Sequence, residues 1–381
     1  MIDRSDRNSA KWDEAARDTH SNDVIALSVA DMDFRAPTEV IDAVKDAATH
    51  GIYGYTNTSD HYYETVKQWL SRQHSWDIPT DWIVYCPRII QAISIIIQNN
   101  TSVGDGILIQ TPLYGPLRRT IELNGRAVVE NPLIYDNGKY EMDFTDLENH
   151  FSRGVKVMIL CSPHNPVGRV WDEWELAKLA ELCAAYHVLL ISDEVHADFT
   201  WEKPHITLGK MDAIRERMVV CTSPGKTFNL PGMEISNIII PNPELREHFR
   251  LNLKQLGFHN PTYFAEPALK AAYNQGIDWL ANLKTYLHAN VEMVNDFFEQ
   301  HLPEFKIVNH EGTYLIWIDY RDCQLTEEDI KYWFFDQAKV AVSLGSSFGN
   351  EGVGFIRLNI ALPRENLENA LQRILATKGA Y

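Results

Sequence analysis

One lysine of this chain stands in a loop whose residue types suit covalent chemistry. Lys226 lies in the segment 223–232, Ser-Pro-Gly-Lys-Thr-Phe-Asn-Leu-Pro-Gly, just past the apolar run 218–220. Small and polar residues let a loop offer backbone N–H groups and a hydroxyl to a phosphate, while the lysine presents an amine to a carbonyl. A pyridoxal 5′-phosphate (PLP) site needs this combination, with the cofactor held as a Schiff base. The alternative interpretation is a surface lysine after a strand.

Two further polar residues also follow strand-like segments. Asn165 comes after the apolar run 155–160, and Asp193 comes directly after the run 187–192. In an open parallel sheet, ligands bind beyond the carboxyl ends of the strands. We therefore expect Asn165, Asp193 and Lys226 to lie at one edge of a sheet.

The three side chains have complementary chemistry. A carboxylate beside a pyridine nitrogen keeps that nitrogen protonated, which fits Asp193. An amide donor stabilises a phenolate oxygen, which fits Asn165. The alternatives are a strand-end cap for Asp193 and a plain turn at Asn165-Pro166.

Strand and helix signals alternate through most of the chain. Helical patterns occur near 62–74, 89–97 and 174–186. The expected strands are 106–110, 155–160, 187–192 and 217–221. This alternation predicts an α/β fold with a mainly parallel sheet covered by helices on both faces.

The pattern changes near Trp279, which indicates a small α+β C-terminal domain. A long helix over 279–300 should lead to a strand at 313–319, a helix at 326–337 and a strand at 354–360. The predicted organisation has three parts: an N-terminal arm with a short helix opened by Pro37 (1–45), a large domain (46–280) and a small domain (281–381).

Length and composition limit the classes of function. A chain of 381 residues fits one large and one small domain. The net charge of −17 argues against nucleic-acid partners and anionic membrane surfaces. No apolar run is long enough to cross a membrane, and the charged segment 1–7 lacks a signal-peptide core. Five scattered cysteines predict reduced thiols, a cytoplasmic location and no metal site.

Several segments resemble the PatB/MalY group of cysteine-S-conjugate β-lyases (cystathionine β-lyases), which belong to the fold-type I PLP-dependent enzymes. The lysine loop is typical of the whole superfamily. Ala30-Asp31-Met32-Asp33-Phe34 and Glu311-Gly312-Thr313-Tyr314-Leu315 are more specific to this group. The other matching segments are 6–13, 51–56, 104–114, 271–280 and 348–364.

The resemblance implies roles for four more residues. Tyr114 should stack on the cofactor ring, and Ser223 should bind its phosphate. Arg357 should clamp the α-carboxylate of the substrate. Tyr55 should reach the phosphate of the neighbouring subunit, which implies a homodimer with shared active sites. The alternatives are a core tyrosine for Tyr114, a strand-end hydroxyl for Ser223, a salt-bridged edge arginine for Arg357 and an ordinary loop aromatic for Tyr55.

The resemblance also implies that the 29–33 loop, with Ala30 and Asp31, lines the substrate entrance; a structural turn is the alternative. Three positions depart from the family pattern. Arg88 stands where glycine is usual, Gly225 where serine is common, and Leu362 where cysteine is frequent. We hypothesise that the Arg88 guanidinium binds the phosphate and offsets the hydroxyl missing at Gly225. Variation in a tolerant loop is the alternative.

The reaction implied is β-elimination from an L-cysteine thioether such as cystathionine, giving a thiol, pyruvate and ammonia. Lys226 would act as the general base on the Cα proton. An aminotransferase on the same scaffold would use the same residues. An added role in binding a transcription activator, known for one branch of the group, is a third hypothesis. The chain has neither a G-x-G-x-x-G nor a Walker A loop beside a strand, which argues against a nicotinamide or ATP enzyme.

Overall fold

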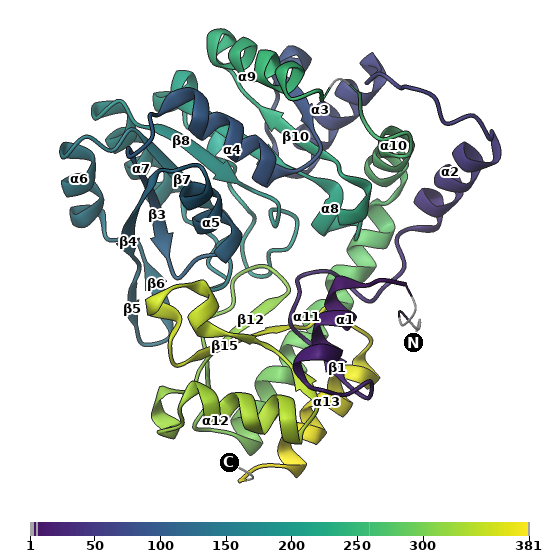
Figure 1. The fold of residues 1–381 in the computed structure, drawn as a ribbon, viewed down its shortest axis with the longest axis vertical. Coiled ribbons are helices and arrows are strands. Elements are labelled where there is room, and N and C mark those ends of the chain that lie inside the picture. Colours follow the sequence, from purple (N-terminus) through teal and green to yellow (C-terminus); the bar gives the residue numbers. More distant parts are fainter. Residues whose placement is uncertain (1–3, 5–6, 259, 380–381) are drawn as a thin grey trace.

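The centre of the molecule is a seven-stranded sheet. The computed structural model describes residues 4, 7–258 and 260–379 (Figure 1). The strand order is β2-β10-β9-β8-β7-β3-β4, and β10 alone runs antiparallel to its neighbours. The strands are β2 Ile83–Cys86, β3 Gly106–Thr111, β4 Ala127–Pro132, β7 Val157–Cys161, β8 Leu189–Asp193, β9 Met218–Thr222 and β10 Ser236–Ile239. The four predicted strands are β3, β7, β8 and β9, and the mainly parallel α/β sheet is confirmed.

Helices cover both faces of this sheet because its strands are apolar on both sides. In β7, Met158 and Leu160 belong to one buried cluster, while Val157 and Ile159 belong to the other. The first cluster includes residues of α3 Asp60–His74, α6 Phe144–Ser152, α7 Glu173–Ala185 and α10 Ala265–Gln275. The second includes residues of α4 Ile89–Asn100, α5 Gly115–Leu123 and α9 Pro243–Gln255.

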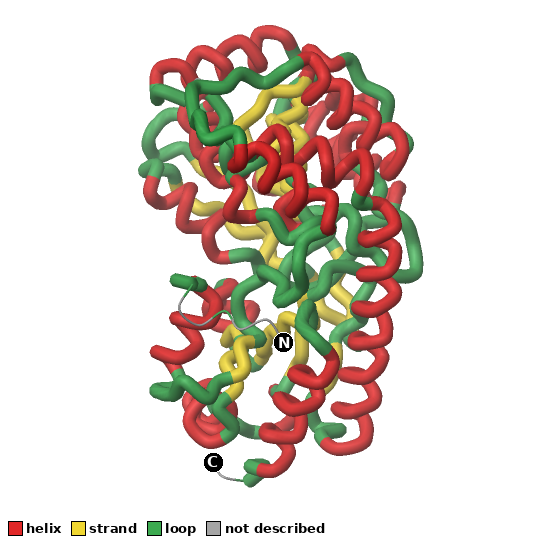
Figure 2. Tube along the Cα trace, turned by 90° about the vertical axis from the view of Figure 1, so that its right-hand side faces the viewer, coloured by secondary structure: helices red, strands yellow, loops and turns green. Residues whose placement is uncertain are grey.

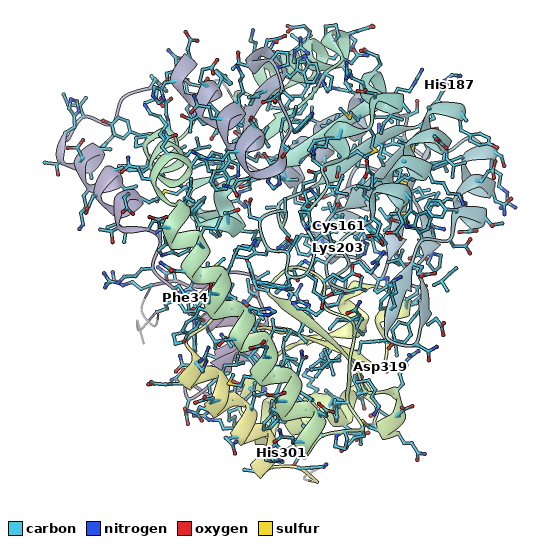
Figure 3. All side chains as sticks on the ribbon, turned by 180° about the vertical axis from the view of Figure 1, so that it is seen from behind. Phe34, Cys161, His187, Lys203, His301 and Asp319 are labelled. Atoms are coloured by element: carbon cyan, nitrogen blue, oxygen red, sulfur yellow. The ribbon has the colours of Figure 1, made fainter. Side chains whose placement is uncertain are left out.

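A smaller antiparallel sheet lies below the first in Figure 1. Its order is β11-β12-β15-β14, formed by β11 Lys306–Ile307, β12 Leu315–Asp319, β15 Phe355–Asn359 and β14 Ser343–Leu344. The long helix α11, Ile277–His301, runs from the region of the large sheet to the smaller one, as Figures 1 and 3 both show. The helix predicted at 326–337 begins as α12 Glu327–Lys331 and continues as a π-helical turn, Tyr332–Gln337. The last helix is α13 Arg364–Ala376.

The N-terminal arm contains more structure than its sequence indicated. Helix α1, Ala10–Asp18, was not predicted. Strand β1, Ile25–Ala26, pairs in parallel with β13, Val340–Ala341, so the arm joins the C-terminal part of the chain. Figure 2 shows the molecule from the side, with helices (red) on both sides of the upper strands (yellow). Helix α2, Thr38–Thr49, follows Pro37 as expected. The domain limits at 45 and 280 stay a prediction.

Two further features complete the fold. Strands β5 Ile134–Asp136 and β6 Lys139–Glu141 form a separate hairpin. Among the helices of the described part, none combines the length and apolar character that a membrane span requires. Of the charged segment 1–7, only residues 4 and 7 are described.

Candidate active site

The loops that follow β7, β8 and β9 lie side by side because these strands are adjacent and parallel. Cys161 pairs with Asp193, and Asp193 pairs with Cys221, so the three strands end at the same level. The loops carry Asn165, Asp193 and Lys226. The arrangement expected from their spacing is therefore the one that the strand register produces.

A cavity of about 790 Å³ opens at this edge of the sheet. Lys226 and Asp193 both line it, with Tyr114, Ser223 and Arg88. The other lining residues are Pro87, Ile89, Ile90, Gln91, Val195, Gly225, Pro231, Glu234, Ile235, Ser236 and Phe258. Five of the residues predicted to hold a cofactor thus share one cavity.

Lys226 is a buried amine in an unusual environment. It belongs to the single-turn helix α8, Pro224–Thr227, and its Nζ donates a hydrogen bond of 2.6 Å to the carbonyl oxygen of Ala30. Burial lowers the pKa of this amine to about 8, although the nearby Asp31 carboxylate opposes the shift. A larger share of the amine is consequently unprotonated near neutral pH than for an exposed lysine, which suits a nucleophile or a base.

Asp193 is a buried carboxylate at the end of β8. Its Oδ1 accepts the Val195 N–H at 3.2 Å. Burial raises the pKa of Asp193 to about 6, while that hydrogen bond and the Lys226 charge act in the opposite direction. A buried carboxylate favours a cationic partner. A protonated pyridine nitrogen is such a partner.

Arg357, from β15, is a buried guanidinium that pairs with no carboxylate of the described residues. Its Nη1 donates to Asn165 Oδ1 at 2.9 Å, and its Nη2 donates to the Ser28 carbonyl oxygen at 2.8 Å and to Ser343 Oγ at 3.1 Å. Its Nε is buried and has no partner in the described chain. Burial lowers its pKa to about 10. An unpaired buried cation with a free donor is suited to an anionic ligand.

Of three other predicted residues, Tyr114 and Ser223 line this cavity and Tyr55 does not. Tyr114 precedes α5, and its backbone N–H donates to the Asn165 carbonyl oxygen at 3.1 Å. Burial, reinforced by Asp193, raises the pKa of the Tyr114 phenol. Ser223 Oγ donates to the Ile235 carbonyl oxygen at 2.5 Å and accepts the Gly225 N–H at 2.9 Å. Tyr55 is 98% exposed and does not line this cavity.

Arg88 faces a carboxylate that sequence reasoning missed. Its Nε and Nη2 donate to Glu234 Oε1 at 3.0 and 2.5 Å. Glu234 belongs to the same cavity and lies eight positions after Lys226. No local pattern pointed to it, because its partner is distant in sequence.

The 29–33 loop reaches the site through its backbone. The Ala30 carbonyl oxygen accepts from both Lys226 Nζ and the Tyr314 hydroxyl, the latter at 3.0 Å. The Asp31 carboxylate pairs with Arg4 at 2.8 Å and lies 3.8 Å from Lys11 Nζ. Sequence reasoning gave no role to Tyr314, although it lies in one of the motifs that carry the family resemblance.

His196 is a second residue without a predicted role. It is 3% exposed, and its ring packs edge-on against Tyr314 with centroids 5.7 Å apart. Neither ring nitrogen makes a hydrogen bond within the described residues, and Nδ1 is fully buried. Burial, together with the Lys226 and Arg357 charges, lowers the pKa of His196 well below its usual value, so the imidazole is uncharged.

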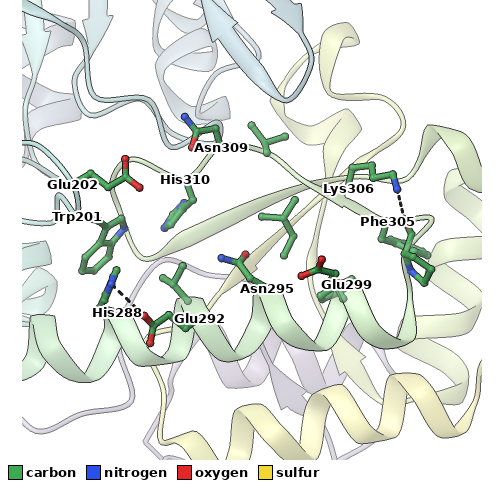
Figure 4. Close-up of a pocket in the computed structure, with 15 residues that line it drawn as sticks. Trp201, Glu202, His288, Glu292, Asn295, Glu299, Phe305, Lys306, Asn309 and His310 are labelled. Atoms are coloured by element: carbon green, nitrogen blue, oxygen red, sulfur yellow. Dashed lines mark hydrogen bonds and ion pairs between the residues drawn. The ribbon is translucent and has the colours of Figure 1, made fainter.

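A second cavity, of about 490 Å³, lies between α11 and the segment 305–310 (Figure 4). Its His288 Nε2 lies 3.6 Å from Glu292 Oε1, and these side chains are 51% and 66% exposed. Lys306, also at this cavity, donates to the Pro303 carbonyl oxygen. These charges are solvated or paired, so this cavity lacks the buried unpaired groups of the first. Within the described residues, no cluster of His, Cys, Asp and Glu could hold a metal ion.

Comparisons with known proteins agree with this geometry. The family model for class I and II aminotransferases matches residues 22–374. Cystathionine β-lyase PatB of Bacillus subtilis (strain 168) is 36% identical over 371 residues, which are 97% of this chain and 96% of PatB. Protein MalY of Escherichia coli (strain K12) is 33% identical over 98% of this chain and 97% of its own length. The crystal structure of cystalysin from Treponema denticola, which contains PLP, superposes with a TM-score of 0.96 at 35% identity, over 99% of this chain and 97% of that one.

Proposed function

The chain belongs to the class I and II aminotransferase family, and on this basis we propose that it is a PLP-dependent C–S β-lyase. Its substrate is L-cystathionine or another L-cysteine S-conjugate, and its products are a thiol, pyruvate and ammonia. The observation that carries the proposal is that the structure buries both a guanidinium without a carboxylate partner, Arg357, and an amine of lowered pKa, Lys226, close enough for their charges to interact. The full-length similarity to proteins named cystathionine β-lyase supports the choice of reaction.

The residues present fit the cofactor. Lys226 would hold its carbonyl carbon, Asp193 its pyridine nitrogen, and Ser223 its phosphate. Tyr114 would pack on the ring, and the Asn165 side-chain nitrogen would serve the phenolate, because Asn165 Oδ1 already accepts from Arg357. The buried Asp193 carboxylate, whose pKa is raised by burial, has no ion-pair partner in the described chain and so favours the pyridinium. When bound, PLP supplies the electron sink that stabilises negative charge at Cα.

The chain's own groups then position and deprotonate the substrate. Arg357 binds the α-carboxylate, to which its unpaired Nε adds a donor. The hydrogen bond from Arg357 to Asn165 fixes the position of the guanidinium relative to the residue that would bind the phenolate of the cofactor ring. The Ala30 carbonyl oxygen, which accepts from Lys226 Nζ, directs the amine to one position.

The elimination moves one proton and two electron pairs. Lys226 Nζ takes the Cα proton, the Cα–H electrons form a bond between Cα and Cβ, and the Cβ–S bond breaks with its electrons on sulfur. The sulfur leaves as the thiolate. Water then converts the three-carbon remainder to pyruvate and ammonia. Ala30 and Asp31 would border the entrance for the thioether, because the Ala30 carbonyl oxygen contacts Lys226, and the Asp31 ion pairs with Arg4 and Lys11 fix that loop.

The test is product formation without a second substrate. PLP-loaded enzyme with L-cystathionine, and with no keto acid, should release pyruvate, measured continuously with lactate dehydrogenase. Lys226→Ala should show neither pyruvate nor the visible absorbance band of bound cofactor. Turnover that requires an added keto acid would instead identify an aminotransferase.

The assembly proposed is a homodimer in which Tyr55 completes the phosphate site of the neighbouring subunit. Its support is exposure: Ile52, Tyr53 and Tyr55 are 68%, 61% and 98% exposed in one chain. Consecutive large apolar side chains on a surface are typical of an interface. A cytoplasmic location is proposed from the five unpaired cysteines, four of them buried.

A further inference from the structure

The active-site cavity contains two acidic and two basic side chains among its described lining residues. The acids are Asp193 and Glu234, and the bases are Lys226 and Arg88. Asp193 and Lys226 have roles in the proposed function. Arg88 and Glu234 form a separate pair, with Arg88 Nε and Nη2 both bonded to Glu234 Oε1.

Glu234 places a negative charge in a cavity proposed to receive a phosphate dianion. The Glu234 backbone is anchored because its carbonyl oxygen accepts from the Tyr85 hydroxyl at 2.8 Å. The residue adopts a left-handed conformation, with φ of 54°. Only 34% of its side chain is exposed. A carboxylate fixed near a phosphate repels it, so a compensating cation is required.

The rest of the cavity offers neutral donors, such as the backbone N–H groups in the first turn of α4, but no further side-chain cation besides Lys226 among its described lining residues. The Ser223 hydroxyl, proposed above to bind the phosphate, is neutral and in this structure donates to the Ile235 carbonyl oxygen. Gly225 has no side chain to add a second hydroxyl. Lys226 is the amine that would bind the cofactor covalently. An amine that forms this bond does not also serve as an ammonium partner of the phosphate. Arg88 is therefore the cation available for the phosphate among the described lining residues.

Arg88 can serve Glu234 and a phosphate together. The guanidinium is a planar fork with five N–H donors. Its Nε and Nη2 edge faces Glu234, while Nη1 makes no hydrogen bond within the described residues. The side chain is 66% exposed and is not confined by packing.

We propose that Arg88 bridges Glu234 and the cofactor phosphate, so that the pair sets the affinity of the protein for PLP. This inference rests on the proposed function. Arg88 neutralises Glu234 and supplies charge-assisted hydrogen bonds to the phosphate. Because Arg88 Nε and Nη2 both bind Glu234 Oε1, the two residues act as a unit.

The experiment is a double-mutant cycle on PLP affinity. Apoproteins of the wild type, Arg88→Gln, Glu234→Gln and the double variant are titrated with PLP, and the Kd is read from absorbance and protein fluorescence. We expect Arg88→Gln to weaken binding about tenfold or more, because a charge-assisted contact is lost and Glu234 is left unpaired. Glu234→Gln should bind as tightly as the wild type or more tightly. The double variant should recover the part of the loss that comes from the unpaired Glu234 carboxylate, but not the part that comes from the lost Arg88 contacts.

Two controls separate this effect from a general change of charge. Lys156→Gln breaks the Lys156–Asp105 pair, whose side chains are 61% and 28% exposed, similar to those of Arg88 and Glu234. Its PLP affinity should equal that of the wild type. Added salt should weaken PLP binding more in the wild type than in Arg88→Gln.

The outcomes are distinguishable. If the wild type binds PLP and Arg88→Gln binds it equally well, the bridge is absent and the pair is an ordinary surface salt bridge. Equal losses in Arg88→Gln and the double variant would also overturn the coupling to Glu234. A wild type that does not bind PLP contradicts the proposed function itself.

Discussion

Arg357 and Asp193 are both buried, and neither forms an ion pair within the described residues. Folding such groups without a partner is unfavourable, so their retention indicates that a ligand completes them. Arg357 favours an anion and Asp193 favours a cation. The α-carboxylate of an amino acid would supply the anion, and a protonated pyridine would supply the cation.

The first prediction concerns the carboxylate clamp. Arg357→Lys keeps the charge but removes the planar fork, so substrate binding should weaken while cofactor binding persists. We expect kcat/KM for L-cystathionine to fall about 100-fold or more, given the strength of bidentate charge-assisted bonds. Steady-state kinetics with a PLP titration checks this. Loss of PLP binding in this variant would show that Arg357 acts on the cofactor instead.

The second prediction follows from the raised pKa of Asp193, about 6 against an ordinary 3.8. Between pH 3.8 and pH 6 the folded protein keeps the Asp193 proton that the unfolded chain loses, so the free energy of unfolding falls as pH rises through this range. Above pH 6 the ionised, buried Asp193 carboxylate destabilises the apoprotein. Asp193→Asn should therefore raise its unfolding free energy at pH 7.5 by about 1 to 3 kcal/mol, at 1.4 kcal/mol per pKa unit. Denaturant unfolding measures this. The kcat of Asp193→Asn should also fall, by at least the loss that removing one electrostatic contact from an active site causes.

The third prediction concerns the pH dependence of cofactor capture. The pKa of Lys226 is lowered to about 8, and only the unprotonated amine attacks a carbonyl. The rate at which apoprotein gains the cofactor absorbance band should thus rise with pH through about 8 and then level off. Stopped-flow absorbance records it. A rate that keeps rising beyond pH 10 would mean that the amine is not desolvated.

At the scale of elements, the single turn α8 is too short to hold Lys226 rigidly by itself. Its last residue, Thr227, donates from Oγ1 to Asp198 Oδ2 at 2.5 Å. Asp198 lies five positions after Asp193, and its Oδ1 is 3.3 Å from His74 Nε2 of α3. This link ties the lysine loop to the aspartate loop.

The fourth prediction tests this link. Thr227→Val removes the donor and leaves a buried carboxylate oxygen without it, which should destabilise the protein by about 1 to 3 kcal/mol. PLP should also dissociate faster, because Lys226 and Asp193 lose their fixed separation. Thr227→Ser keeps the hydroxyl and should behave as the wild type. Equal dissociation rates in the Val and Ser variants would refute a positioning role.

At the scale of the whole molecule, α11 runs from the large sheet to the smaller one, and the β1–β13 pair joins the N-terminal arm to the C-terminal part of the chain. The 52–55 segment projects its apolar side chains outward instead. If Tyr55 of one subunit serves the site of the other, the active unit is a dimer with two shared sites.

The fifth prediction is complementation between inactive subunits. Tyr55→Ala and Lys226→Ala homodimers should each have low activity. Mixed and re-equilibrated at equal amounts, they should regain about a quarter of wild-type activity, because half of the dimers are mixed and each has one intact site. Activity assays with light scattering measure this. Activity that stays at the sum of the parents would show that Tyr55 acts within its own chain.

The sequence by itself determined the parts of this protein that depend on local order. Apolar runs ending in polar residues located β7, β8 and β9, and the parallel direction of these strands brought Asn165, Asp193 and Lys226 to one edge. The cofactor and the reaction were inferred from those residues and from motif resemblance. Helix α1 escaped prediction, because its short pattern in the arm is stabilised by packing against β1 and β13.

Tertiary structure alone decided the contacts between distant positions. The bond from Lys226 to the Ala30 carbonyl oxygen spans 196 positions, the Arg357–Asn165 bond spans 192, and the Arg88–Glu234 pair spans 146. No periodicity encodes such pairs, because they depend on how strands cross and how the two sheets meet. The sequence thus supplied the candidate groups for the chemistry, and the fold decided which of them are buried, paired or left free for a ligand.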